Sequence, residues 1–355
     1  MMVGWFTLNP VTRKRLQRFR SIKRGYYSLL VFLFAIMLSI FANFLANNRP
    51  MILMYEGKLY FPTFEFLSVG EFGQQDIYGF TDAEADYRRL KVEWKDTRNW
   101  MLLPPIHFNP VENDFGFYKD PPPNAPDSRH LLGTDSQGRD VLARLLYGFR
   151  ISIFFSLALV TITMTIGVTA GLLQGYFGGR FDILGQRFVE IWSTLPPLYM
   201  VIIIGTALRP TFGLLLIVLA VFDWMGITYY MRTESYREKS REYVTAARAM
   251  GASHWRIIFK HLLPNSLTPL ITTIPFSIIA GIFSLTSLDF LGYGLPPPTP
   301  SWGELMEQAL DSTNRSALWL TLSPFAAIFL TLLVVTLIGE SLREAFDPKR
   351  YTRYE

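Results

Sequence analysis

The stretch EYVTAARAMGASHWRIIFKHLLPN, residues Glu242 to Asn265, is polar and basic and lies between long apolar runs. Its first part, up to Met250, consists mostly of good helix formers. Gly251 stands where a left-handed C-cap would end that helix. Ser253 is suited to cap a second short helix, which Pro264 is expected to end. The stretch therefore predicts two short helices joined by a glycine hinge and held between two membrane spans.

The same stretch resembles the EAA loop of bacterial ATP-binding-cassette (ABC) importer permeases, the loop that in this family docks into the ATPase subunit. Thr245 stands in the position of the family's Glu and His261 in that of its Ile, as in the oligopeptide and nickel branch. A chance amphipathic loop is the alternative, and the spacing over about 20 residues argues against it. The resemblance implies docking by Glu242, Ala246, Ala247, Arg248, Gly251, His261, Leu263 and Pro264.

The composition is typical of a multi-span membrane protein. Of 355 residues, 50% are hydrophobic, and the mean hydropathy is +0.22. The chain contains no Cys, which excludes disulfides, thiol nucleophiles and Cys-ligated metals, and its four His lack the spacing of a zinc site. The net charge is +5. In so apolar a chain, we interpret the basic residues as marking the cytoplasmic side of a membrane rather than a nucleic-acid-binding surface.

The apolar runs predict an all-α polytopic membrane protein with six transmembrane helices. A basic arm, residues 1–25, precedes the first span at 26–46, which is too long for the apolar core of a signal peptide. An insert, residues 47–149, separates it from a permease core at 150–340, and a tail follows at 341–355. The core is expected to contain spans at 151–173, 191–208, 212–231, 267–288 and 317–338, a coupling loop at 232–266 and an outer loop at 289–316.

The insert differs in character from the spans. It contains fifteen Asp and Glu against eleven Lys and Arg and is rich in Pro, Trp and Tyr. We expect a mainly irregular domain with some strand and one helix between Glu84 and Lys95. Its acidic residues and His107 are scattered rather than clustered, which argues against a membrane-anchored enzyme or sensor.

Two further motifs flank the core. The segment HLLGTDSQGRD, residues 130–140, predicts an amphipathic helix, capped by Asp135, that lies in the membrane interface before the second span. The run DFLGYGLPPPTPSWG, residues 289–303, is too rich in Pro and Gly for regular helix. Both resemble segments of dipeptide and oligopeptide permeases. The resemblance implies a periplasmic gate or a contact with the binding protein, formed by Asp135, Gly138, Arg139, Asp140, Arg144, Gly292, Gly294 and Trp302.

Asp223 is the one ionisable residue well inside an apolar run. Such residues are costly in a membrane and are candidates for a transport pathway. A structural hydrogen bond to a neighbouring helix explains the residue equally well. An ion-coupled secondary transporter would use Asp223 as its coupling site, but the internal repeats typical of that class are not evident.

Basic residues are distributed as in a protein with both termini in the cytoplasm. Twenty Lys and Arg fall in the arm, the loop around Arg180 and Arg187, the coupling loop and the tail, whereas the two short outer loops carry only Arg209 and Arg315. This asymmetry sets the orientation of a membrane protein, and long external domains are exempt from it. The insert is therefore expected in the periplasm.

Taken with this orientation, the resemblance implies a non-catalytic permease subunit of a bacterial inner-membrane importer for peptides or related solutes, working by alternating access. The long insert is similar to the subgroup linked to microcin C uptake. Expected partners are a homologous permease in a heterodimer, two cytoplasmic ABC ATPase subunits, a periplasmic solute-binding protein and the lipid membrane, with no nucleic acid. Because the chain has no GxxxxGK[ST] motif, ATP and Mg are expected on the ATPase subunits and no cofactor or metal is expected here.

The orientation can be tested with single cysteines, because the chain has none of its own. In cells with a permeabilised outer membrane, an impermeant maleimide is expected to label Asn113→Cys and to spare Ser253→Cys. Labelling of Ser253→Cys alone would reverse the predicted topology.

Overall fold

The computed structural model describes residues 10–74, 82–94, 97–115 and 118–347. The chain forms two compact units. Of the described residues, the first unit contains 10–33, 152–296 and 328–347, and the second contains those within 34–151 and 297–327.

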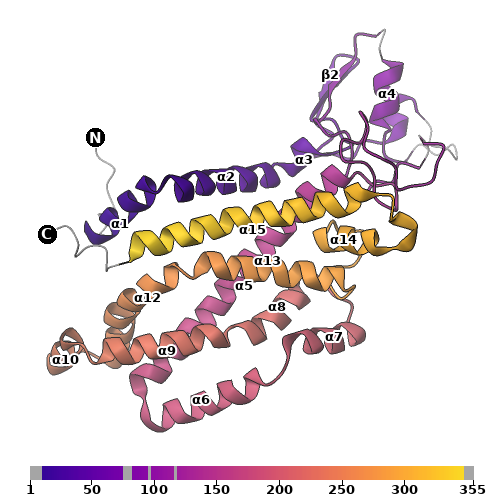
Figure 1. Ribbon diagram of the computed structural model, residues 1–355. Helices are drawn as coiled ribbons and strands as arrows, with labels where there is room; N and C mark the ends of the chain where they lie inside the picture. The colour runs from indigo at the N-terminus through magenta and orange to yellow at the C-terminus, as the bar shows by residue number, and fades with distance from the viewer. Residues whose placement is uncertain (1–9, 75–81, 95–96, 116–117, 348–355) are drawn as a thin grey trace, which may run out of the picture. The chain divides into compact units, whose positions relative to one another are not determined.

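Most of the described chain is helical, and three long helices, α2, α5 and α15, contribute residues to both units (Figure 1). The helices lying wholly or partly in the first unit are α1 (Pro10–Ser21), α2 (Lys23–Ile40), α5 (Val141–Phe177), α6 (Gly179–Ser193), α7 (Pro197–Ala207), α8 (Phe212–Asp223), α9 (Met225–Lys239), α10 (Glu242–Ala249), α11 (His254–Arg256), the π-helical segment η2 (Ile257–Leu262), α12 (Leu263–Ile271), α13 (Ile274–Phe290) and α15 (Leu318–Phe346).

Three of the described helices, α2, α5 and α15, are each long and apolar enough to cross a membrane. The pairs α6–α7 and α8–α9 qualify only as bent pairs, with bends of 66° and 40°, so the described chain has up to five such segments. Helix α13 is a shorter apolar helix of 17 residues.

Each of these bent pairs contains a break between its two helices, whereas uninterrupted spans were expected at 191–208 and 212–231. The first break has a local cause, because Pro196 and Pro197 lack the N–H groups that would continue α6 into α7. The second break contains no proline. Here the Val221 carbonyl accepts hydrogen bonds from the indole N–H groups of Trp192, at 3.0 Å, and Trp224, at 2.8 Å. Side-chain donors thus satisfy backbone at a point where an apolar helix bends.

Helix α9 packs very closely on α5. Gly167, Gly171 and Gly175 follow one another at four-residue intervals and therefore lie on one face of α5. A Cβ atom on Gly171 would lie 2.6 Å from the backbone oxygen of Thr228, and one on Gly175 would lie 2.5 Å from the Cβ atom of Ser235. Small residues at such positions let two helix backbones approach each other.

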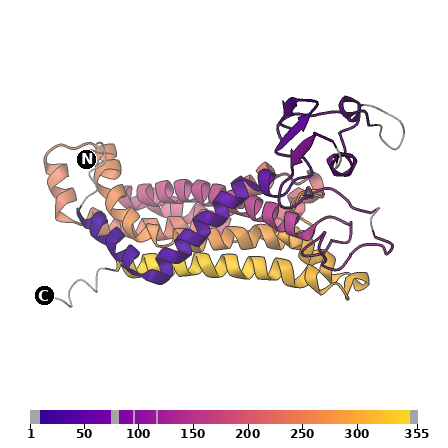
Figure 2. The same cartoon turned by 90° about the horizontal axis from the view of Figure 1, so that it is seen from above.

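The second unit contains a small sheet, so the expectation of an all-α chain was incomplete. Its helices are α3 (Ala42–Leu45), α4 (Tyr87–Glu93) and α14 (Trp302–Leu310), with short 3₁₀ turns η1 (Val69–Phe72) and η3 (Ser312–Asn314). Strands β2 (Lys58–Tyr60), β1 (Ile52–Tyr55) and β3 (Trp100–Leu102) form an antiparallel sheet in that order, close to α4 (Figure 2). Leu53, Phe72, Leu90 and Trp94 contribute to a core of its own for this part of the insert.

Helix α5 begins at Val141 and continues for 37 residues. The separate interfacial helix expected after Asp135 is therefore not present, because nothing interrupts the helix between Val141 and the apolar run. Its N-terminus is capped by Asp140 rather than by Asp135, since Asp140 Oδ1 accepts a hydrogen bond from the Ala143 amide at 2.7 Å.

Candidate functional site

The segment Glu242–Asn265 begins with a helix that ends as its sequence predicted. Helix α10 closes at a glycine C-cap in which Gly251 has φ +77°. The Gly251 amide donates to the Arg248 carbonyl, and the Ala252 amide donates to the Ala247 carbonyl, each at 3.0 Å. This pair of bonds is the Schellman motif, which requires a left-handed residue at the position of Gly251. The hinge is confirmed.

The second short helix also begins as expected. Ser253 caps α11 by accepting a hydrogen bond from the Arg256 amide at 3.4 Å. His254 follows, and its Nδ1 lies 2.7 Å from the Tyr176 hydroxyl at the end of α5. The hinge and the second helix are therefore fixed to the bundle rather than free.

Pro264 does not end this helix, contrary to expectation. From Ile257 to Leu262 the backbone becomes π-helical and then continues into α12, with Pro264 in its first turn. The Leu263 amide bonds to the Ile258 carbonyl, five residues back, so the turn is wider than an α-turn. Proline has no backbone N–H group to donate, and its ring would collide with the preceding turn of a regular α-helix. The π segment supplies that room, and such bulges occur frequently at functional sites.

One face of the segment is buried in the first unit. Val244, Ala247, Ile257, Ile258 and Leu262 are almost inaccessible to solvent. They pack in one cluster with Leu172 and Tyr176 of α5, Met231 of α9 and Leu270 of α12. Because this cluster joins α10 and the π-helical segment to α5, α9 and α12, the Glu242–Asn265 segment is held firmly at its base.

The opposite face exposes large apolar side chains. Met250, Trp255 and Phe259 are 81%, 58% and 53% exposed, and the last two rings stack at 5.9 Å. Glu242, Ala246, Arg248, Gly251 and Pro264 are exposed as well, His261 and Leu263 are partly buried, and Ala247 is buried. Of the eight predicted docking residues, Ala247 thus belongs to the base of the segment.

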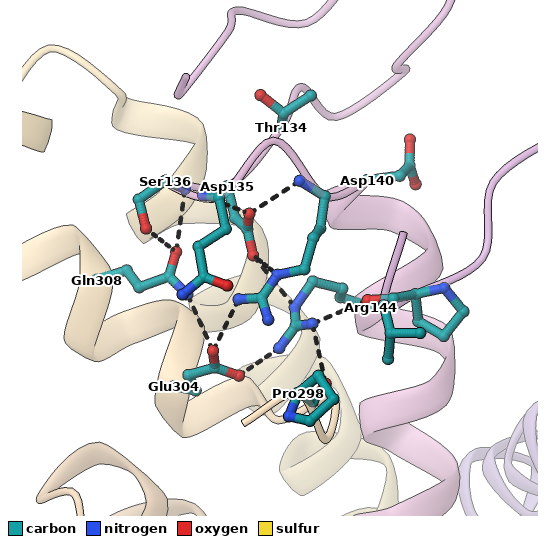
Figure 3. A network of polar contacts seen from close by, with 12 residues as sticks. Thr134, Asp135, Ser136, Asp140, Arg144, Pro298, Glu304 and Gln308 are labelled. Atoms are coloured by element: carbon teal, nitrogen blue, oxygen red, sulfur yellow. Dashed lines mark hydrogen bonds and ion pairs between the residues drawn. The ribbon is translucent and has the colours of Figure 1, made fainter. Parts of the chain in front are cut away.

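A buried network of charges occupies the second unit (Figure 3). Asp135 accepts from Arg139 Nε at 2.7 Å and lies 3.4 Å from Arg144 Nε. On the other side, Glu304 pairs with both guanidinium groups, at 2.8 Å from Arg139 Nη2. Exposure is 0% for Asp135, 1% for Arg139, 0% for Arg144 and 8% for Glu304. Two cations and two anions therefore alternate in an almost fully buried cluster.

Further polar contacts connect this network to distant parts of the second unit. Arg144 Nη1 donates to the Pro110 carbonyl of the insert at 2.8 Å. Gln308 accepts from the amide and the hydroxyl of Ser136, and its own amide donates to Glu304 at 3.2 Å. The network thus joins the insert, the start of α5 and α14.

Asp140 belongs to a neighbouring set of buried polar groups. His130 is fully buried, with Nδ1 2.8 Å from Asp140 Oδ2 and Nε2 3.2 Å from Asp114 Oδ2. Arg129 Nε donates to Asp114 at 2.7 Å. Burial raises the pKa of the Asp114 carboxyl, but hydrogen bonds from Arg129 and His130 outweigh burial and hold that pKa below its ordinary value.

The predicted gate residues fall into two groups. Asp135, Gly138, Arg139, Asp140, Arg144 and Trp302 lie in the second unit, where Trp302 Nε1 donates to the Leu145 carbonyl at 3.0 Å. Gly292, with φ +77°, and Gly294 form a turn after α13 in the first unit. Within the second unit, the structure brings the first group together.

Six side chains of these networks were not among the predicted site residues: Asp114, Arg129, His130, Ser136, Glu304 and Gln308. A signal for Glu304 was present, because two arginines close to an apolar run need buried anions, and Asp135 supplies only one. His130 was quoted within its motif, but nothing local indicates that both of its ring nitrogens meet carboxylates.

Asp223 is the last residue of α8 and lies at the bend before α9 rather than in the middle of a helix. It lines a cavity of about 290 Å³ in the first unit, together with residues of α5 and α13. The predicted pathway residue is thus placed at a helix break.

Comparison with known proteins identifies related chains. Residues 167–351 match the family described as "Binding-protein-dependent transport system inner membrane component". The inner membrane ABC transporter permease protein YejE of Escherichia coli K12 is 40% identical over 97% of this chain and 98% of its own. The peptidoglycan transport system permease protein YejE of Agrobacterium fabrum is 39% identical over 98% of this chain and 95% of its own.

More distant relatives match a smaller part of the chain. The dipeptide transport system permease protein DppC of Haemophilus influenzae is 36% identical over 62% of this chain and 74% of its own. Among solved structures, an inward-facing MetNI methionine ABC transporter chain superposes with a TM-score of 0.46 at 16% identity, over 57% of this chain and 97% of that one.

The charge network predicts a specific loss of stability. Glu304→Gln leaves two buried guanidinium groups with one carboxylate, and removing one partner of a buried pair costs about 3–5 kcal/mol. We expect a lower thermal unfolding temperature for the purified subunit in detergent. Glu307→Gln on the exposed side of the same helix is the matched control. Equal unfolding temperatures for both variants would contradict this account.

Proposed function

Because the chain belongs to the family of binding-protein-dependent transport system inner membrane components, we propose that it is the membrane-spanning permease subunit of an ATP-driven importer of peptides or peptide-like solutes. The observation that carries this proposal is the geometry of the Glu242–Asn265 segment. Two short helices meet at a left-handed glycine, are buried at their base and expose an apolar face. We propose that this segment is the coupling loop, which docks into an ATPase subunit.

The exposed face of the coupling loop has the chemistry of a protein interface. Methionine, aromatic residues and arginine are enriched at such interfaces, and Met250, Trp255, Phe259 and Arg248 are all exposed here. The resemblance of the segment to a loop that docks into an ATPase subunit favours a protein over lipid as the partner of this patch. A partner in the cytoplasm therefore accounts better for its exposure.

The substrate class is inferred from the relatives. One is named for peptidoglycan transport and another for dipeptide transport, and the long insert resembles the subgroup linked to microcin C. The solutes in these three cases are all peptides or contain a peptide. The proposal is tested by deleting the chain and measuring uptake of labelled di- and tripeptides, peptidoglycan-derived peptides and microcin C, with restoration by the intact chain. Unchanged uptake of all of them would exclude it.

The proposed assembly has two permeases, two ATPase subunits and a periplasmic binding protein. In this arrangement six spans cross the inner membrane, the sixth being provided by α13 with α12, and both termini are cytoplasmic. The insert would then face the periplasm and the binding protein. ATP and Mg would be held by the ATPase subunits. Membership of this family favours ATP-driven transport over an ion-coupled secondary transporter.

Gly251→Val is expected to leave the amount of the subunit in membranes near normal while import falls sharply. A β-branched residue at φ +77° costs about 1–3 kcal/mol. This is small against the stability of the bundle, but about 1.4 kcal/mol already changes a docking affinity tenfold. The measurement is uptake together with pull-down of the ATPase subunits from the same membranes.

Gly251→Asn is the matched control, because Asn tolerates the left-handed conformation better than other residues with a side chain. It should retain most of the docking, and Gly251→Ala should fall between the two. Nothing lies within 4 Å of a Cβ atom at this position, so the series reports backbone strain rather than a clash within the chain. Wild-type uptake and pull-down for Gly251→Val would remove the hinge from the mechanism.

The apolar face is tested separately by Trp255→Ser. Loss of this exposed ring should reduce retention of the ATPase subunits about tenfold, as expected for an aromatic residue that anchors an interface. Leu310→Ser, on α14 and 71% exposed, is the control and should retain them. If Trp255→Ser retains the ATPase subunits as the wild type does, the partner does not use this face.

A further inference from the structure

The cavity beside Asp223 combines one carboxylate with three hydroxyl groups. Thr163 of α5 and Ser277 and Ser284 of α13 line it together with Asp223, and most of the remaining wall is apolar. Its volume of about 290 Å³ is roughly ten times the ~30 Å³ that one water molecule occupies in the liquid. The space is large enough for the end group of a peptide.

Among the residues that the structure describes, none pairs with the Asp223 carboxylate in this cavity. Within the described part of the chain, no hydrogen bond or ion pair reaches its carboxylate. Asp182 of α6 shows the contrast, because it accepts hydrogen bonds from Arg232 Nη2 at 2.6 Å and from the Tyr236 hydroxyl at 2.7 Å. A carboxylate in an apolar segment is costly unless something pairs with it. Asp223 is exposed and lines the cavity, so its carboxylate is accessible to a ligand.

The polar groups around Asp223 are suited to a cation. Of the described residues that line the cavity, none is Lys, Arg or His, so they offer no positive charge to an anion. The Thr163 hydroxyl donates its hydrogen to the Leu159 carbonyl at 2.8 Å, which leaves its oxygen free to accept. An ammonium group has three donors and no acceptor. One carboxylate and three hydroxyl oxygens can satisfy it.

A divalent metal ion fits these groups less well. Ca²⁺ takes six to eight oxygen ligands and Mg²⁺ demands six in octahedral geometry. Among the described residues, no group of three or more His, Cys, Asp or Glu side chains could hold a metal. An organic ammonium needs fewer oxygens and no fixed coordination geometry.

We propose that this cavity binds the protonated amino group of the peptide cargo during its passage, with Asp223 as the counter-ion. The inference rests on the proposed function for the source of the amino group. Gly226, one turn after Asp223, would keep the site accessible, because a Cβ atom there would meet nothing within 4 Å. The bend between α8 and α9 places both residues on the wall of the same cavity.

The first experiment measures the local charge directly and does not depend on transport. In the otherwise Cys-free chain, Gly226→Cys in the assembled complex is labelled with cationic aminoethyl and anionic sulfonatoethyl methanethiosulfonate. The quantity measured is the labelling rate of the cationic reagent divided by that of the anionic reagent. Adding Asp223→Asn is expected to lower this ratio about tenfold, because the loss of one nearby negative charge changes the relative interaction energy of the two reagents by about 1.4 kcal/mol.

Gly213→Cys is the control for this experiment. It lies ten residues before Asp223 in α8, about 15 Å along the helix, and a Cβ atom there also meets nothing within 4 Å. Its ratio should not respond to Asp223→Asn. A ratio at Gly226→Cys that is equally unresponsive would overturn the cation site.

The second experiment connects the site to the cargo. Uptake of a tripeptide with a free amino group is compared with uptake of its N-acetylated form. Asp223→Asn should lower the ratio of free to N-acetylated tripeptide uptake at least tenfold, while the amount of subunit in the membrane and the retention of ATPase subunits stay normal. Asp223→Glu should restore part of this ratio. Because the binding protein is the same throughout, the change in the ratio reports the permease.

The outcomes separate this inference from the proposed function. An unchanged uptake ratio in an assembled, active complex would overturn the role of Asp223 in cargo recognition. Protection of Gly226→Cys by sodium or potassium chloride, but not by the free tripeptide, would assign the site to an inorganic ion and overturn it as well. Failure of the wild type to retain ATPase subunits or import any peptide would instead refute the proposed function, and the labelling ratio would still decide whether a cation site exists.

Discussion

The close approach of α5 and α9 is the contact on which the first unit depends. At Gly171 the backbone of α9 is so near that a single methyl group would collide with the Thr228 carbonyl. This approach brings Leu172 and Tyr176 of α5 beside Met231 of α9, and the base of the Glu242–Asn265 segment packs on these same residues. The position of the proposed docking surface is therefore set by small residues in a neighbouring helix, whereas its shape is set within the segment itself.

The second unit depends on charge more than on size. Two arginines and two carboxylates are buried together, and each charge needs both of its neighbours. A buried network of this kind contributes little net stability compared with an apolar core of equal volume. Its effect is on geometry, since only one arrangement of Arg139, Arg144, Asp135 and Glu304 pairs all four charges. The insert, the start of α5 and α14 are thereby held in a defined arrangement within this unit.

Irregular helix geometry occurs at two places that matter for the proposed function: the cavity beside Asp223, and the connection between the coupling loop and α12. The bend after Asp223 lies at a cavity whose one carboxylate has no hydrogen bond or ion pair within the described part of the chain. The π segment before Pro264 passes the chain from the short helices of the loop into α12 without a break. In an apolar environment an interrupted helix is tolerated only where other groups satisfy its backbone, and the two indoles at Val221 do so at the bend. The two proposed functional elements and the helix distortions thus occupy the same places.

The sequence by itself determined the features that depend on local chemistry. The glycine hinge and the Ser253 cap could be predicted because each rests on residues a few positions apart, and the family could be recognised because its motifs are short and contiguous. Only the tertiary structure decided which charges are buried, since Glu304 meets Arg144 across 160 residues, and whether Pro264 ends a helix, since a π segment can absorb its ring. The same holds for Asp223, whose cavity is lined by α8 and α9 together with α5 and α13, which are distant from them in sequence, so that no local pattern reveals it.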